Sequence, residues 1–302
     1  MKSVLVLLNA RAGTLIDSGT EQVREQIKSA LAGAGRKIDI RLLQPRQMAP
    51  AIGEAARSDH DTIVVGGGDG SVSSAAGALA GGGKTLGVLP FGTLNLLARD
   101  LGMPAKPMEA IAALACAQPR RIDLASVNGR PFHSLSGLGF FSQMARAREE
   151  MRGHPLGRMI GVGLAAIRAL RRTKPFALEI SADGRLTSVE ALAFLVTNNR
   201  FGKDWRRGRL DGGVLEVHIA QTKSGLGMLK ASADLLTGGW RGNPEIQSFA
   251  ARELTIGHKR RRAWAATDGE LMREAVPLRY DMLPGALTVL AVPGEAVTSS
   301  SA

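Results

Sequence analysis

A glycine-rich segment that follows a buried apolar run is the first place where this sequence could do chemistry. Residues 66–71 read Gly-Gly-Gly-Asp-Gly-Ser, directly after Thr62–Val65 and at the start of a helix-like stretch, Ser71–Leu79. Glycines there let backbone N–H groups approach a ligand closely, and the start of a helix adds a partial positive charge. The pattern favours a phosphate-binding loop over an ordinary tight turn. Its members would be Gly67, Gly68, Asp69, Gly70 and Ser71.

A second strand–loop–helix segment carries polar side chains at an equivalent place. Leu86–Leu89 is a short apolar run, and the loop after it holds Gly92, Thr93 and Asn95. We expect these side chains to lie beside the first loop, because ligands in such sheets sit beyond the carboxyl ends of neighbouring strands. Ordinary helix capping is the alternative role for a Thr and an Asn at this position.

Two carboxylates flank a glycine far downstream, in the segment Thr267-Asp268-Gly269-Glu270. Paired carboxylates suit a site where one accepts a proton and the other helps to hold a metal ion. Asp-Gly is also a frequent turn, so this short motif is weak evidence by itself.

The segment Gly81-Gly82-Gly83-Lys84-Thr85 imitates the end of a nucleotide-binding Walker A loop. The first glycine of that motif should fall at position 78, which is Ala78, and here a helix precedes the glycines where a strand should. We interpret the segment as a helix-to-strand turn with a solvated Lys84.

Short apolar runs alternate with helix-like stretches over the first 125 residues, which predicts βαβ units and a doubly wound parallel sheet. The expected strands are Val4–Leu8, Ile38–Leu43, Thr62–Val65 and Leu86–Leu89, and the expected helices are Glu21–Leu31, Ala49–Arg57 and Ser71–Leu79.

The second half has a different texture, with more strands and with turn signals such as Asn128-Gly129 and Asp183-Gly184. The expected strands are Ile122–Val127, Pro131–Ser134, Phe176–Ser181, Ala191–Thr197, Leu215–Ile219, Leu254–Ile256, Arg262–Ala266 and Leu287–Val292. Helices are expected over Phe141–Arg152, Arg158–Arg171 and Leu226–Leu236. We therefore expect an α/β domain over residues 1–125, a β-rich, β-sandwich-like domain over 126–294, and a frayed tail over 295–302.

The three motifs together are more specific than any one of them. Gly-Gly-Asp-Gly, then Pro-x-Gly-Thr-x-Asn, then a distant Asp-Gly-Glu, resemble the diacylglycerol kinase catalytic domain family, which includes bacterial lipid kinases and sphingosine kinases. Further segments match in order over nearly the whole chain: Asn9–Gly13, Arg121–Leu124, Gly137–Gly139, Asn198–Arg200, Leu210–Gly213 and Leu283–Leu287. The first loop alone is shared with NAD kinases.

The resemblance implies an NAD kinase/diacylglycerol kinase-like fold and an ATP-dependent lipid kinase that phosphorylates the hydroxyl of diacylglycerol or a related lipid. ATP would bind the first domain, with Asn9 beside the two glycine loops, and the lipid would bind the second domain. Asp69 would belong to the catalytic nucleotide and Mg²⁺ network, and Asp268 would be the general base. Asp123, Asp211 and Glu270 would complete the acidic, metal-binding set.

The sequence departs from the family pattern at four positions. Ser71 stands for the usual Thr, Leu96 stands where many members carry an Asp, Ser136 stands near a usual Asn, and Gly212 replaces one of two adjacent Asp. The changes concern the metal arrangement more than the fold.

Charge and composition limit the partners. The net charge of +12 favours an anionic partner such as a nucleotide, a nucleic acid or an acidic membrane surface. Aromatic residues make up only 4%, which disfavours a single-strand nucleic-acid binder. Basic clusters at 171–174, 206–209 and 259–262 could instead dock on an anionic membrane.

One cysteine and no apolar run near the ~18 residues of a membrane span favour a cytoplasmic, peripherally membrane-associated protein. A homodimer stays open. Two other functions also stay open: a non-lipid kinase of the NAD kinase type, and a non-catalytic nucleotide- or lipid-binding protein.

Overall fold

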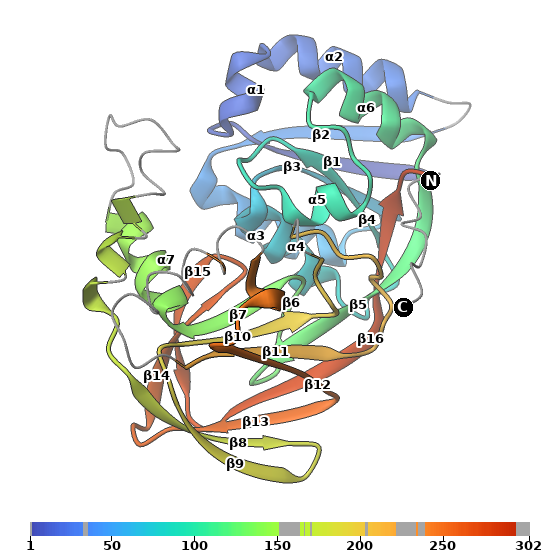
Figure 1. Cartoon of the computed structure of the whole chain (residues 1–302). Coiled ribbons are helices and arrows are strands. Elements are labelled where there is room, and N and C mark those ends of the chain that lie inside the picture. The colour runs from blue at the N-terminus through green and yellow to red at the C-terminus, as the bar shows by residue number, and fades with distance from the viewer. Residues whose placement is uncertain are drawn as a thin grey trace. The chain divides into compact units, whose positions relative to one another are not determined.

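The fold is given by a computed structural model, which describes residues 2–32, 36–150, 164–165, 167–169, 171–202, 205–221, 234 and 239–293 (Figure 1). The chain divides into two structural units. The first comprises Met1–Leu124, Gly208–Asp211 and Pro284–Ala302, and the second comprises Ala125–Arg207 and Gly212–Leu283. Neither unit is one uninterrupted stretch, which differs from the expected split after residue 125.

The first unit is built on a parallel sheet. Its strands lie in the order β2 (Lys37–Leu43), β1 (Ser3–Asn9), β3 (Thr62–Gly67) and β4 (Thr85–Pro90). The three inner strands are buried along almost their whole length, as is typical of a sheet covered on both faces. The last strand of the chain, β16 (Leu278–Ala291), joins this sheet by pairing parallel to β4 through Thr288 and Val289. Strand pairing with β4 is thus why residues after 283 belong to the first unit.

Helices cover both faces of this sheet, α2 with α6 on one and α3 with α4 on the other, which confirms the expected doubly wound domain (Figure 1). The helices of the unit are α1 (Gly13–Asp17), α2 (Thr20–Leu31), α3 (Pro45–Arg57), α4 (Asp69–Leu79), α5 (Leu96–Asp100) and α6 (Pro107–Cys116). The sequence did not predict α6, because its alanine-rich, largely apolar stretch lacks the polar face of an amphipathic helix.

The second unit is a sandwich of two mostly antiparallel sheets, as expected. The six-stranded sheet has the order β12 (Ile246–Ala251), β11 (Leu215–Ala220), β10 (Ala193–Asn198), β7 (Leu135–Gly139), β14 (Arg262–Thr267) and β15 (Glu270–Ala275). The opposing strands are the end of β5 (Gln118–Val127), β6 (Arg130–Phe132), β8 (Phe176–Ala182), β9 (Arg185–Ala191), β13 (Glu253–Gly257) and the first part of β16. Helix α7 (Phe140–Glu150) and the short 3-10 helix η1 (Gly239–Gly242) accompany them.

A single apolar core fills this sandwich. It includes Phe132, Leu178, Phe194, Val217 and Tyr280, each no more than 2% exposed. Core residues alternate with outward-facing residues along β8 and β13, whereas β10 and β11 are buried along their whole length.

Several strands of the second unit were not predicted. Strand β7 contains two glycines, and β9 and β15 are largely exposed edge strands without a clear apolar alternation. The expected helices at 158–171 and 226–236 lie mostly outside the described residues, as do the end of the expected helix 141–152 and the expected tail. No helix in the described part of the chain is both long and apolar enough to cross a bilayer.

Candidate active site

Three loops of the first unit meet at the carboxyl edge of its parallel sheet. The register pairs Leu8 with Gly66 and Gly67 with Pro90, so β1, β3 and β4 end side by side. The loops that follow them begin at Asn9, Gly68 and Phe91. The structure therefore brings together the two glycine loops and the Asn9 loop that the sequence singled out.

The glycines of these loops are needed because the backbones touch. A Cβ atom on Gly92 would lie 2.4 Å from the Cα of Gly68, and a Cβ on Gly67 would lie 2.8 Å from the Ser71 hydroxyl oxygen. No side chain fits such gaps. A Cβ on Gly68 itself would meet the Gly92 Cα at 3.4 Å, which is an ordinary van der Waals distance. Gly92 is thus the position where the close approach of the two loops excludes any other residue.

Asp69 ties the two loops together. Its Oδ2 accepts the backbone N–H of Asn95 at 3.0 Å, and its Oδ1 accepts that of Leu96 at 2.7 Å. Asp69 therefore satisfies the first N–H groups of α5, which no carbonyl of that helix can reach. Leu96 contributes a backbone donor here, so its side chain need not carry a carboxylate for this contact.

Asn95 shapes its own loop. Its backbone is left-handed, with φ of 49°, a conformation that Asn tolerates better than most residues. Its Oδ1 accepts the Gly92 N–H at 2.9 Å, and its Nδ2 donates to the carbonyls of Pro90 and Gly92. Thr93, by contrast, is exposed at the loop surface.

The amino end of α4 supplies the positive part of the site. Gly68 precedes the 11-residue helix, and the backbone N–H groups of Ser71 and Val72 donate to its carbonyl. The N–H groups of Asp69 and Gly70 lie in the first turn, where intrahelical acceptors are lacking and the helix dipole favours an anion. Asn9 lies beside this turn, with its Cβ 3.6 Å from a Cβ built on Gly67.

The two other acidic candidates of the first unit, Asp123 and Asp211, are engaged by donors. Asp123 is 4% exposed and its Oδ1 accepts the Gly285 N–H at 2.8 Å. Asp211 lies 3.2 Å from the Arg209 guanidinium and 3.8 Å from that of Arg120. Within the described ranges, no three His, Cys, Asp or Glu side chains form a group that could hold a metal ion.

Asp268 lies in the second unit, at the turn of the β14–β15 hairpin. It and Gly269 both have positive φ, 48° and 85°, which matches a two-residue hairpin turn. Its side chain is fully buried and accepts the backbone N–H groups of His133, Ser134 and Leu135. The Ser134 hydroxyl donates a fourth hydrogen bond at 2.6 Å. Glu270, two residues on, is exposed.

The sequence missed the residues that surround Asp268. His133 is fully buried, and its Nε2 lies 3.7 Å from Asp268 Oδ2. The His133 carbonyl accepts the Asn198 amide and a guanidinium N–H of Arg207. Arg207 is 3% exposed, so it is not available to the membrane-docking cluster expected at 206–209. The only available signal was the Asn198–Arg200 match, which named the strand end but not its partners.

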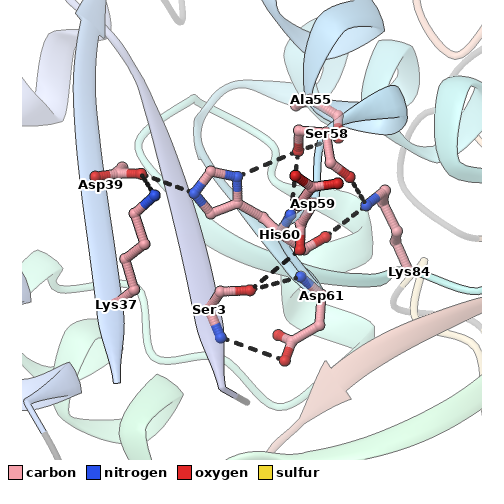
Figure 2. Close-up of polar contacts among 9 residues, drawn as sticks. All are labelled: Ser3, Lys37, Asp39, Ala55, Ser58, Asp59, His60, Asp61 and Lys84. Carbon is pink, nitrogen blue, oxygen red and sulfur yellow. Dashed lines mark hydrogen bonds and ion pairs between the residues drawn. The ribbon is translucent and has the colours of Figure 1, made fainter. Parts of the chain in front are cut away.

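Lys84 is not solvated, as the sequence led us to expect, but anchored on backbone carbonyls. Its ammonium group is partly buried and donates to the carbonyls of Ser58 and His60, which follow the end of α3 (Figure 2). A cation at a helix carboxyl end is favourable. The contact lies where β3 and β4 begin, away from the loops at the carboxyl edge, so Lys84 is a structural anchor and not a phosphate ligand.

The same corner holds a wider polar network (Figure 2). His60 Nε2 lies 2.8 Å from Asp39 Oδ2, and Asp61 accepts the backbone N–H of Ser3. Asp61 also accepts the backbone N–H of Lys2. The hydrogen bond from His60 lowers the pKa of Asp39, more than the partly opposing effect of its burial raises it. These bonds fix the amino ends of β1, β2 and β3.

Two family models match the chain. "Diacylglycerol kinase catalytic domain" matches residues 3–127, and "YegS C-terminal NAD kinase beta sandwich-like domain" matches residues 139–291. Among curated proteins, a "Probable lipid kinase YegS-like" protein of Pseudomonas aeruginosa is 29% identical over 300 residues, covering 91% of this chain and 92% of its own. "Diacylglycerol kinase" of Bacillus subtilis is 33% identical over 147 residues, 48% of each chain.

The fold has solved relatives. A crystal structure of a diacylglycerol kinase from Bacillus anthracis str. Sterne aligns with a TM-score of 0.71 at 20% identity, covering 97% of both chains. At this identity the alignment speaks for the fold alone.

Proposed function

This chain belongs to the lipid kinase family that combines a diacylglycerol kinase catalytic domain with a YegS-type C-terminal domain, and from that premise we propose how it transfers a phosphoryl group from ATP to a lipid hydroxyl. The observation that carries the proposal is the joining of the two glycine loops by Asp69 at the amino end of α4. Phosphoryl transfer needs mainly alignment of the phosphates and positive charge around them.

ATP phosphates would bind at the start of α4, in the surface formed by Gly67–Ser71, Gly92 and Asn9. Backbone N–H groups and the helix dipole supply the favourable field there. Because Gly92 and Gly68 lie in contact, the two loops form one rigid surface. Thr93, which is exposed at the same edge, is free to reach a nucleotide.

Carboxylates of this unit have the hard oxygen donors that Mg²⁺ takes. Mg²⁺ is usually held by only one or two carboxylates together with substrate phosphates, so a three-carboxylate cluster is not required. Asp69 and Asp123 are the residues that we propose to hold it. Asp211 is less suited, because two guanidinium groups within 4 Å compete for its charge. When bound, the ion would neutralise charge on the transferring phosphoryl group.

We propose Asp268 as the group that takes the proton of the acceptor hydroxyl, provided that a lipid hydroxyl can reach its carboxylate. Both of its oxygens already accept hydrogen bonds from the segment His133–Leu135. Its side chain is also fully buried, so the surrounding segment must move before an oxygen can reach a lipid hydroxyl. In the state described, Asp268 holds this segment in place, and Glu270 is the exposed carboxylate of the turn.

A substrate held in a bilayer requires the enzyme to work at a membrane surface. The net charge of +12 supports peripheral attachment to anionic lipids, in which each Lys or Arg near the surface contributes about 1 kcal/mol. Such attachment would weaken with salt, because the field falls off within a Debye length of about 8–10 Å.

The test is transfer of labelled phosphate from ATP to a panel of lipids with free hydroxyls, diacylglycerol among them, in the presence of Mg²⁺. We expect a labelled lipid product with the intact protein and none with Asp69→Ala. ATP binding by calorimetry without any labelled lipid would return the protein to the class of nucleotide- or lipid-binding proteins. Label on NAD instead of a lipid would make it an NAD kinase.

A further inference from the structure

Trp264 is a large aromatic side chain on the surface of the second unit. It is 44% exposed, while its strand neighbours Ala263 and Ala265 point into the core of the sandwich. The guanidinium carbon of Arg146, from α7, lies 5.1 Å from the centre of the indole ring. A Trp whose ring stacks with a cation and remains open to solvent has no role in the core that would explain it.

Cations surround this indole on its own face of the sheet. The register sets Trp264 directly opposite Arg273 on β15, and Arg262 lies two residues away on β14. Side chains at these positions share one face. Lys259, Arg260 and Arg261, all exposed, form the loop that leads into β14. We call these residues, Trp264 with Arg146, Lys259, Arg260, Arg261, Arg262 and Arg273, the Trp264 surface.

Few acidic groups oppose this charge. Glu149 and Glu150 end α7, and Glu150 lies 2.9 Å from Arg172. Glu274 is buried and, like Glu270, alternates onto the other face of β15. Within the part of the chain that the structure describes, the cations of the Trp264 surface form no ion pair with a carboxylate.

The other two basic clusters differ from this one. Arg207 is buried, and Arg209 pairs with Asp211. Arg172 pairs with Glu150. Among the described residues, the cluster at 259–262 is therefore the one in which every cation is exposed and none pairs with a carboxylate, and it lies beside an exposed indole.

We propose that the Trp264 surface is the face by which the protein lies on an anionic lipid bilayer. Tryptophan prefers the boundary between water and hydrocarbon, where its ring is apolar and its N–H is wet. Arginines beside it bind lipid phosphates. This inference rests on the proposed function, since an enzyme acting on a lipid must lie on the membrane that contains it.

Trp264 lies on the same β14–β15 hairpin as Asp268, so membrane docking would also affect the position of Asp268. Asp268 follows Trp264 by four residues on the same hairpin, which is about 13 Å along a strand. Docking through Trp264 would thus hold the Asp268–Glu270 turn close to the level of the lipid head groups.

The test measures partition of the full-length protein onto vesicles of phosphatidylcholine alone and with 30% phosphatidylglycerol (roughly the charge of an acidic leaflet). We expect Trp264→Ser to lower the partition coefficient on the anionic vesicles about five- to tenfold, from loss of partial indole burial. Arg262→Gln with Arg273→Gln should lower it about fivefold per charge, and less so in high salt.

Leu186→Ser is the matched control, because Leu186 is 82% exposed on β9, away from the Trp264 surface. It should leave partition unchanged. Quenching of indole fluorescence by brominated lipid should also fall in Trp264→Ser relative to the native protein. Unfolding temperatures check that each variant is folded.

Two results would overturn the proposal: an unchanged partition coefficient in Trp264→Ser, or an equal loss in Leu186→Ser. Binding to RNA that outcompetes anionic vesicles would assign the surface to a nucleic acid instead. Phosphorylation of a short-chain, water-dispersed lipid by the same variants keeps the two ideas apart. If the native protein phosphorylates this lipid but does not bind vesicles, only the docking proposal fails; if the native protein does not phosphorylate it, the proposed function fails.

Discussion

At the scale of single residues, two candidate aspartates, one in each structural unit, accept hydrogen bonds from backbone N–H groups. Asp69 holds two donors of the loop before α5, and Asp268 holds three donors and a hydroxyl around Ser134. Hydrogen bonds to an ionised group are stronger than those between neutral groups. Each carboxylate therefore positions a segment of chain as well as any substrate it touches.

Replacing Asp268 separates these two roles. An amide has a single acceptor oxygen, and its NH₂ group would face N–H donors, so Asp268→Asn should lower the free energy of unfolding by about 1–3 kcal/mol. If Asp268 takes the acceptor proton, kcat should also fall on the order of 10²–10⁴ while ATP affinity stays the same. Urea unfolding, steady-state kinetics and calorimetry measure the three quantities.

Ser134→Ala is the control for that experiment, because it removes one donor and leaves the carboxylate. We expect a smaller loss of stability and turnover within a few-fold of the native rate. A loss of rate in Ser134→Ala as large as in Asp268→Asn would show that the position of the segment matters and not the base. Near-native turnover in Asp268→Asn would mean that another group accepts the proton.

Glu216 predicts a pH dependence of stability. Burial raises its pKa, but the hydrogen bond from His218 and the charges of His218 and Arg241 outweigh burial and hold the pKa below its ordinary value of 4.5. A group with a lowered folded pKa stabilises the fold above its unfolded pKa and loses this effect as pH falls through the folded value. Glu216→Gln should therefore cost about 1–3 kcal/mol at pH 7 and progressively less below about pH 4.5.

The measurement is urea unfolding of the native protein and Glu216→Gln between pH 3 and pH 7 (a range of about 4 units around the carboxylate pKa). Glu190→Gln, which removes the same charge from an exposed position on β9, should show little difference at any pH. A difference between native and Glu216→Gln that stays constant over this range would contradict the assignment.

At the scale of elements, the conformation of the β4–α5 loop is fixed by specific contacts. Gly92 lets it touch the β3–α4 loop, Asn95 closes it, and Asp69 ties it to the first turn of α4. These contacts come from two separate strand ends, so each loop helps to position the other.

Gly92→Ala should break this arrangement. The new Cβ would lie 2.4 Å from the Gly68 Cα, so one loop must move, and ATP affinity measured by calorimetry should fall at least about tenfold, the equivalent of about 1.4 kcal/mol. Gly68→Ala is the matched variant, since its Cβ meets the Gly92 Cα at 3.4 Å. It should keep most of the affinity. Equal losses in the two variants would mean that the methyl group blocks the nucleotide and that the packing of the loops is unimportant.

At the scale of the whole molecule, a late strand of the chain packs in the sheet formed by its first strands. Strand β16 pairs with β4, the Gly81 N–H donates to the Ala286 carbonyl, and Leu287, Val289 and Leu290 are buried. The first unit therefore includes both ends of the chain, and its core is complete only when the last strand is present.

A fragment of residues 1–127 should for this reason be much less stable than the first unit of the full chain. Loss of buried side chains of this size costs about 2–5 kcal/mol each, comparable to the whole stability of a small domain. Circular dichroism should show a lower or absent unfolding transition, and ATP binding should weaken. Joining residues 278–293 to the fragment through a flexible linker should restore both. A fragment that melts like the full chain would contradict this account.

The sequence by itself determined the class of fold and which loops form the candidate site. Alternating strand and helix patterns, and glycines directly after buried strands, are local features, and local features are set by neighbours along the chain. The order of the motifs along the chain identified the family in the same way. Strands with few apolar residues, such as β9 and β15, escaped because their stability comes from pairing and not from their own composition.

Only the tertiary structure decided what the polar side chains do. Asp69 bonds to residues 26 and 27 positions away, and Asp268 to residues 133–135 positions away, so no local pattern could name these partners. For the same reason Arg207 was expected to face a membrane and Lys84 to face solvent, yet both are anchored on distant carbonyls. The position of a charged side chain depends on the donors and acceptors that folding brings within its reach. Burial strengthens this dependence, because a polar group that is buried without a partner is costly.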